Sequence, residues 1–265
     1  MSLDVAGLTK TYQSSGRSVE AIRDLTFRIE PGELVCIVGP SGAGKTTLLR
    51  CIAGLLDVSG GEIRLDDTPV TEPPAGMAVV FQEYGRSLFP WLTVRKNVEL
   101  PIKSRPDRTA RADAALAAVG LLDSADRHPW ELSGGMQQRV AIARAVAYEP
   151  SVLLMDEPFA AVDAQTRADL EDLVRTLWRQ LGVTVLFVTH DIDESVYLGQ
   201  RVLVLSNRPT VILEDVRIDL PDDRDQLTTR SSAQFAELRT HVYELVQQAK
   251  RGDRPAAAYD GQELQ

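Results

Sequence analysis

The apolar residues of the chain fall into short runs separated by stretches with helical spacing. Near the N-terminus apolar and polar residues alternate, as at Leu3, Val5 and Leu8, which is typical of strands with one buried face. Residues 34–38 form a continuous apolar run, as expected of a strand buried on both faces. Further strand-like runs lie at 63–65, 78–81, 152–155, 183–189 and 201–205. This order of elements predicts an α/β protein.

The segment from about residue 88 to 150 differs because helical stretches replace the strand-like runs. Residues 108–119 are rich in alanine and charged residues, and residues 137–148 form a second helical stretch. We therefore predict a helical insertion in the α/β core. Other helices are predicted to begin near Lys45, to cover 164–181 and to cover 235–246. From 251 to 265 no periodicity remains, which predicts a loose tail.

Composition and charge narrow the class of protein. The 265 residues are 44% apolar, enough for a substantial core, and their net charge of −9 argues against a nucleic-acid partner. Cys36 and Cys51 are expected to be buried free thiols in a reducing compartment. No leader peptide is recognisable, and no apolar run approaches the roughly 20 residues of a membrane span. We therefore expect a cytosolic chain that reaches a membrane only through a partner.

A glycine-rich segment follows the apolar run 34–38 and precedes a predicted helix. It fits the phosphate-binding pattern G-x-x-x-x-G-K-[ST], in which curled backbone directs N–H groups at phosphates. Lys45 would reach the β- and γ-phosphates of a nucleotide, and the Thr46 hydroxyl would bind Mg²⁺. The predicted nucleotide-binding residues here are Gly39, Pro40, Ser41, Gly42, Ala43, Gly44, Lys45, Thr46 and Thr47.

Two carboxylates end the apolar run 152–155. A carboxylate at the C-terminal edge of a parallel strand lies where α/β sheets bind ligands. Asp156 is predicted to hold Mg²⁺, and Glu157 to polarise an attacking water. The alternative is a solvated acidic pair that begins a loop, since Pro158 follows.

Two more polar residues follow predicted strands. His190 follows the run 183–189, so it is expected at the same sheet edge, where it can contact a γ-phosphate. A histidine that caps a helix or packs against neighbouring residues is the alternative. Gln82 follows the run 78–81, and its amide can bind Mg²⁺ or a water. Its alternative is an exposed polar loop residue.

A second candidate anion site precedes another predicted helix. Ser133, Gly134 and Gly135 stand where N–H groups at a helix N-terminus attract anions. One chain already has a phosphate loop, so a second site is redundant within a monomer. We infer that it caps ATP held by another copy of the chain. A plain helix cap is the alternative.

Aromatic residues suggest two further contacts. Tyr12 could stack on adenine, or it could be a packing aromatic. Trp91, Leu92 and Val94 could line a groove for a partner helix, or they could pack the core of the insertion.

These residues together resemble the ATPase subunit of an ATP-binding cassette transporter over about residues 3–250. The matches are residues 39–47 with the Walker A loop, 152–157 with Walker B and its glutamate, 132–137 with the family signature, Gln82 with the Q-loop, His190 with the switch histidine, Tyr12 with the adenine-stacking aromatic and 160–163 with the D-loop. Ala160 and Val162 depart from the usual D-loop residues. Residues 89–94 and 189–195 look most like importer subunits of the nitrate, sulfonate and taurine group.

The resemblance implies a fold and a mode of action. The fold is a P-loop NTPase core with a mixed, largely parallel sheet, an N-terminal antiparallel β subdomain and an inserted helical subdomain at about 88–150. Two copies of the chain would enclose two ATP molecules with Mg²⁺, bound by Thr46, Gln82 and Asp156. Lys45, Glu157 and His190 would act in hydrolysis.

The resemblance also implies partners. They are transmembrane permease subunits and, indirectly, a separate solute-binding protein, which place the chain at the cytoplasmic face of the membrane. A soluble ATPase of the same superfamily without a membrane partner is the main alternative. A small-molecule P-loop kinase is a more remote one, because the segment 132–137 argues against it.

Overall fold

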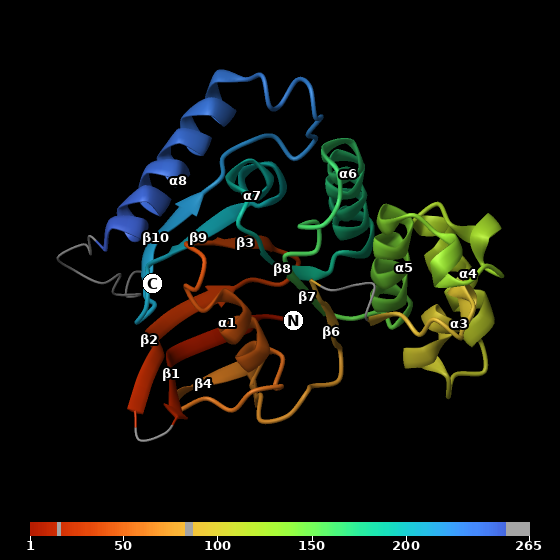
Figure 1. Ribbon diagram of the computed structural model, residues 1–265, viewed down its shortest axis with the longest axis horizontal. Helices are drawn as coiled ribbons and strands as arrows, with labels where there is room; N and C mark the ends of the chain where they lie inside the picture. Colours follow the sequence, from red (N-terminus) through yellow and green to blue (C-terminus); the bar gives the residue numbers. More distant parts are fainter. Residues whose placement is uncertain (15–16, 83–86, 253–265) are drawn as a thin grey trace. The chain divides into compact units, whose positions relative to one another are not determined.

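The computed structural model describes residues 1–14, 17–82 and 87–252 of the chain (Figure 1). They form two compact units. The first unit joins residues 1–74 to the residues from 184 onward, and the second unit is the intervening segment 75–183. The predicted helical segment 88–150 therefore lies wholly within the second unit, together with neighbouring strands.

An antiparallel sheet forms the N-terminal part of the first unit. The strand order is β2-β1-β4-β5, and Leu3 of β1 faces both Ile29 of β2 and Leu65 of β4. The apolar residues Leu3, Val5 and Leu8 are buried, as the alternation predicts. The strands are β1 (Leu3–Ser14), β2 (Arg17–Ile29), β4 (Gly60–Leu65) and β5 (Thr68–Pro69).

The remaining strands of the first unit form a mixed sheet. Strands β9, β3 and β8 run parallel, and β10 pairs antiparallel with β9. Every residue of β3 and β8 is buried, which confirms the prediction for continuous apolar runs. These strands are β3 (Leu34–Val38), β8 (Thr184–Val188), β9 (Arg201–Leu205) and β10 (Ile212–Arg217).

Three helices accompany this mixed sheet. Helix α7 packs against β3 and β9, and α8 packs against β9, β10 and α7 (Figure 1). The side chains of Asp191 and Ser232 cap the first turns of α7 and α8. The helices are α1 (Lys45–Ile52), α7 (Ile192–Leu198) and α8 (Ala233–Arg251). Gly252 ends α8 in the left-handed conformation, and the rest of the predicted tail lies outside the described residues.

The second unit combines one parallel strand pair with a group of helices. Strands β6 (Met77–Val80) and β7 (Val152–Asp156) pair in parallel. Helices α3, α4 and α5 pack on one another, and α6 packs on α5. The helices are α3 (Val94–Glu99), α4 (Arg108–Ala118), α5 (Gly134–Ala147) and α6 (Ala164–Leu181), with short 3-10 turns at Leu100–Ile102, Leu122–Ser124 and Pro129–Glu131. Helix α5 begins three residues before the predicted 137, because Ser133 supplies its cap.

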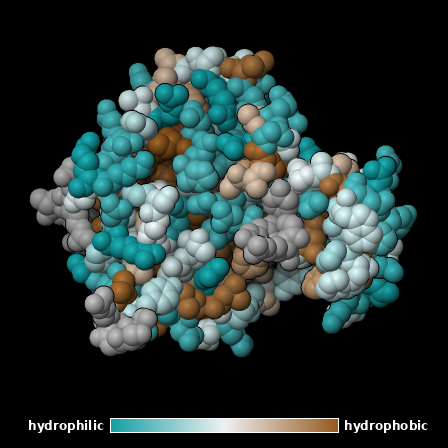
Figure 2. Space-filling model, viewed as in Figure 1, coloured by the Kyte–Doolittle hydropathy of each residue, from teal (hydrophilic) through white to brown (hydrophobic). Residues whose placement is uncertain are grey.

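One face of the molecule is largely polar. The face in Figure 2 is mostly hydrophilic with scattered apolar residues. Both cysteines are buried, as predicted, and no disulfide joins them. Burial raises the pKa of the Cys51 thiol to about 11. Among the helices of the described residues, none combines the length and apolar character needed to cross a bilayer.

Candidate functional site

The glycine-rich segment 39–47 connects β3 to α1 in the first unit. Gly42 and Gly44 adopt φ values of 80° and 81°, a region that residues with a Cβ rarely enter. The Ala43 N–H donates to the carbonyl of Pro40 at 3.1 Å and closes the turn. At Gly39 an added Cβ would lie 3.0 Å from the carbonyl oxygen of Leu205, so β9 allows no side chain there. The glycines of the motif are therefore required both by backbone conformation and by close packing.

Lys45 is held inside this loop. Its side chain is 6% exposed, and its ammonium donates to the carbonyl oxygens of Gly39 at 3.0 Å and Pro40 at 3.2 Å. A buried ammonium needs such oxygen partners. Phosphate oxygens are stronger acceptors than carbonyl oxygens because they carry charge. The loop thus holds a cation at the positive N-terminal end of α1, where an anion binds most favourably.

Thr210 holds the same loop through a buried hydrogen bond. It is fully buried, and its hydroxyl donates to the carbonyl oxygen of Ala43. Its backbone is bonded to β2 through the Ala21 carbonyl and the Arg23 N–H, each at 3.0 Å. No motif marks this threonine, which lies in the connection between β9 and β10. Sequence analysis therefore missed it.

Tyr12 is not a core aromatic. It is 39% exposed on β1, and its hydroxyl lies 3.2 Å from the hydroxyl of Thr47 at the start of α1. The ammonium of Lys10 lies 5.3 Å from the ring centroid. The ring is thus tethered beside the phosphate loop with part of its surface accessible, which suits a planar base better than the packing alternative.

His190 is exposed and follows β8 directly. Because β8 is parallel to β3, His190 and the phosphate loop follow the same edge of the mixed sheet. The cap of α7 is Asp191, whose side chain accepts from the Glu194 N–H at 3.1 Å. The helix-capping alternative for His190 is therefore wrong.

The second unit brings together Asp156, Glu157 and Gln82. Strands β6 and β7 are parallel, so the residues that follow them share one edge. The Gln82 amide donates to a Glu157 carboxylate oxygen at 3.4 Å. Asp156 is only 4% exposed, which disfavours the solvated acidic pair. Glu157 has φ 44°, a strained value for a residue with a Cβ, and such strain is concentrated at functional sites.

The signature segment forms the beginning of α5. Ser133 is the N-cap, and its hydroxyl oxygen accepts from the Met136 N–H at 3.3 Å. The N–H groups of Gly134 and Gly135 fall in the first turn, where no intrahelical acceptor exists. They stand at the positive end of a 14-residue helix. The helix cap and the anion site are thus compatible, because the serine O–H can still donate.

The residues predicted to line a partner groove differ in their exposure. Val94 is buried in the core, whereas Trp91 is 70% exposed and its ring contacts the Phe89 ring edge-on, with 5.3 Å between the ring centroids.

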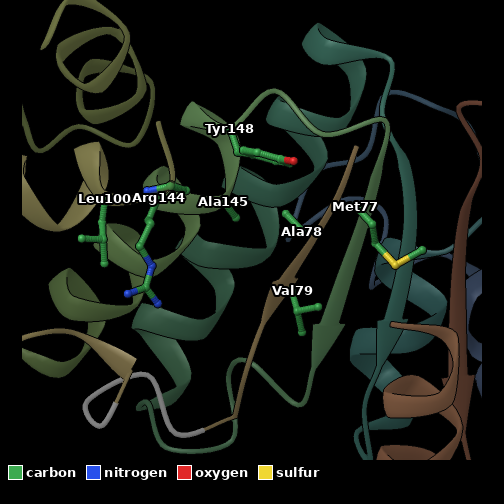
Figure 3. Close-up of a pocket in the computed structure, with 8 residues that line it drawn as sticks. Met77, Ala78, Val79, Leu100, Arg144, Ala145 and Tyr148 are labelled. Carbon is green, nitrogen blue, oxygen red and sulfur yellow. The ribbon is translucent and has the colours of Figure 1, made fainter. Parts of the chain in front are cut away.

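A separate cavity of about 350 Å³ opens in the second unit (Figure 3). It is lined by Met77, Ala78, Val79, Leu100, Pro101, Arg144, Ala145 and Tyr148. Arg144 donates to Ser87, and burial lowers the pKa of its guanidinium.

Comparison with known proteins shows to which family the chain belongs. A family model described as "ABC transporter" matches residues 22–160, more than half of the chain. The chain belongs to the ABC transporter family.

Several of the similar proteins are named import ATP-binding proteins. The chain is 46% identical over 235 residues to the nitrate import ATP-binding protein of Synechocystis sp., covering 87% of this chain and 88% of that protein. It is 39% identical over 253 residues to the aliphatic sulfonates import ATP-binding protein of Bacillus cereus, covering 95% and 97%. The chain is thus an ABC ATPase, as the motifs predict.

A solved ABC structure confirms the predicted fold class. It is the dimeric structure of a post-hydrolysis state of an ATP-binding cassette bound to ADP and Pi. The TM-score is 0.73 at 32% identity, and the match covers 83% of this chain and all of that one. ATP as the nucleotide agrees with the prediction from the glycine loop.

Proposed function

We propose that two copies of this chain enclose two ATP molecules, each held by the phosphate loop of one copy and by Ser133, Gly134 and Gly135 of the other. The start of α5 carries this proposal. Its capped first turn presents unbonded N–H groups at the positive end of a long helix. The dimeric cassette among the similar structures supports the pairing.

In this proposal the residues of segment 39–47 hold the phosphates. The N–H groups of the loop and the Lys45 ammonium bind the β- and γ-phosphates, and the Tyr12 ring stacks on adenine. Thr46, Gln82 and Asp156 would hold Mg²⁺, since their oxygens are the hard donors that this ion prefers. Asp156 fits because it is a buried carboxylate at a strand end. Mg²⁺, when bound, neutralises phosphate charge.

Glu157 is the proposed general base for hydrolysis. Its carboxylate accepts a proton from water as the water oxygen bonds to the γ-phosphorus and the bond to the bridging oxygen of ADP breaks. The Gln82 amide orients this carboxylate through the bond that the structure contains. His190 at the sheet edge of the first unit would donate to the γ-phosphate and help to order the water.

Substitution Glu157→Gln tests this assignment. The amide keeps the size and the hydrogen-bonding position of the side chain but cannot take a proton. We expect ATP affinity within about threefold of native and a turnover at least ~100-fold lower, as for loss of a general base. Phosphate release and ATP titration measure the two quantities. Native turnover by this variant would remove Glu157 from its role.

The partners in the membrane are the next part of the proposal. We propose that the chain powers import of small anions resembling nitrate or sulfonates, delivered by a solute-binding protein to permease subunits. The relatives named for such imports support this. The chain would lie at the cytoplasmic face of the membrane, with the exposed Trp91 facing a permease helix.

Purification of the tagged chain in mild detergent tests this docking. We expect a polytopic membrane protein to co-purify with the native chain and to be lost with Trp91→Ala, because an exposed tryptophan is a typical interface anchor. Exposed Trp130→Ala is the matched control and should retain the partner. Equal recovery with Trp91→Ala would reject this surface, and no membrane partner at all would favour a soluble ABC ATPase.

A further inference from the structure

A contact between α6 and the start of α5 has no place in the proposed mechanism. An added Cβ on Gly135 would lie 2.4 Å from the Cγ2 methyl of Thr166. Non-bonded carbon atoms do not approach within 3 Å of each other, so the methyl occupies the space that a side chain at 135 would need. Both residues belong to the second unit.

The conformation of Gly135 does not require glycine. It lies in the first turn of α5, and its φ is outside the left-handed region. This distinguishes it from Gly42 and Gly44, whose positive φ values demand glycine. What excludes a side chain at 135 is therefore the Thr166 methyl.

The methyl itself cannot turn away. Thr166 is the third residue of α6, whose N-cap is Asp163. One Asp163 oxygen accepts from the Thr166 N–H at 2.9 Å, and the other accepts from the Thr166 hydroxyl at 2.7 Å. Any other χ1 rotamer breaks the hydroxyl bond. These two bonds lower the pKa of Asp163, so its carboxylate is charged at neutral pH and the bonds persist.

We propose that Thr166 is a positioning residue: pinned by Asp163, its methyl sets the place of Gly135, so that residues 160–163 and the ATP-capping end of α5 move as one piece. The inference rests on the proposed role of Ser133, Gly134 and Gly135. Donors must lie within a few tenths of an ångström of their place to bind a phosphate oxygen well, because hydrogen bonds weaken steeply with geometry. A displacement at Asp163 would therefore change how the chain grips the ATP of its partner copy.

A double-mutant cycle in the Glu157→Gln background tests this coupling. The variants are Gly135→Ala, Thr166→Ser and their combination. Thr166→Ser keeps the hydroxyl bonded to Asp163 and removes only the methyl. Gly135→Ala combined with Thr176→Ser is the matched control, because Thr176 lies on the exposed side of the same helix. For each protein we would measure the ATP-driven monomer–dimer constant, the ATP affinity of the monomer and the melting temperature.

We expect Gly135→Ala to weaken dimerisation at least about tenfold, the effect of overpacking a tight contact. Thr166→Ser alone should weaken it about threefold, and the double variant should return to that level because the clash is gone. The Thr176→Ser combination should show no recovery. ATP affinity of the monomer should stay native throughout, since the phosphate loop is untouched.

Three outcomes would overturn the proposal. They are native dimerisation by Gly135→Ala, a double variant no better than Gly135→Ala, and recovery of the melting temperature without recovery of dimerisation. If Glu157→Gln with native Gly135 fails to dimerise on ATP, the proposed function fails instead. In that case the melting temperatures still test the contact between Gly135 and Thr166. If Thr166→Ser does not raise the melting temperature of Gly135→Ala, the contact is rejected.

Discussion

At the scale of single residues, the hydroxyl of Thr210 links the phosphate loop to the body of the first unit. It donates to the Ala43 carbonyl in a fully buried position, while the Thr210 backbone is bonded to β2. Substitution Thr210→Val keeps the shape and removes the donor. We expect the free energy of unfolding to fall by about 1–3 kcal/mol, the cost of a buried acceptor left without its partner. ATP affinity should weaken severalfold because the loop loses its brace.

The matched control for this change is Thr176→Val. The Thr176 hydroxyl also donates to a backbone carbonyl, that of Asp172 at 2.8 Å, but it does so on an exposed helix face. Water replaces the lost donor there, so unfolding and ATP affinity should stay near native. Denaturant unfolding and ATP titration measure both quantities. Equal behaviour of the two variants would contradict the bracing role of Thr210.

At the scale of elements, β1 and β4 are joined where their backbones almost touch. An added Cβ on Gly61 would lie 2.2 Å from the Gly7 carbonyl oxygen, and Gly61 has φ 74°. Gly7 and Gly61 lie at the register shift between the pairs Ala6–Glu62 and Thr9–Gly60, so the paired residues on either side hold both backbones in place. We expect Gly61→Ala to lower the free energy of unfolding by at least ~3 kcal/mol, from overpacking plus left-handed strain.

Gly182→Ala separates these two contributions. Gly182 caps α6 with φ 59°, and nothing lies within 4 Å of its added Cβ. The substitution should therefore cost about 1 kcal/mol, from left-handed strain alone. Thermal and denaturant unfolding of both variants make the comparison. A loss for Gly61→Ala no larger than that for Gly182→Ala would show that β1 and β4 separate without cost.

At the scale of the whole molecule, the proposed pairing predicts that two inactive chains repair each other. Lys45→Ala removes the cation of the phosphate loop, and Gly134→Asp puts a carboxylate where a γ-phosphate should bind. Each variant alone should be nearly inactive. A mixed dimer has one complete site, built from the phosphate loop of one copy and the native α5 of the other.

An equimolar mixture should recover about a quarter of the native rate, because half of randomly formed symmetric dimers are mixed and each has one of its two sites intact. Phosphate release over a range of mixing ratios measures this. A mixture as inactive as its components would contradict a site shared between copies. Full activity of Gly134→Asp alone would remove the start of α5 from the site.

Much of the fold was predictable because its signals are local. Continuous apolar runs marked β3 and β8, and both are buried throughout. The G-x-x-x-x-G-K-[ST] pattern predicted the loop, and Gly42 and Gly44 adopt the positive φ that the pattern needs. The start of α5 was placed three residues late, since glycines in a first turn show no helical periodicity.

The sequence predicted the residues of the candidate site but not the residues that hold them in position. Polar residues directly after predicted strands were enough to propose Gln82, Asp156 and His190 as site residues. Thr166 and Thr210 were missed, because a threonine on a helix or in a loop has no distinctive neighbours in the sequence. Trp91 and Val94 were taken as one group, although one is exposed and the other buried.

By itself, then, the sequence determined which segments form strands and helices, which residues could bind phosphate and which family the chain belongs to. These depend on burial, backbone freedom and capping, which act among near neighbours. Only the tertiary structure decided that Thr210 supports Ala43 across 167 residues, that Thr166 excludes a side chain at Gly135, and that Glu157 is strained. Such contacts depend on how the folded elements pack, and the order of residues does not show which side chains from distant segments will meet.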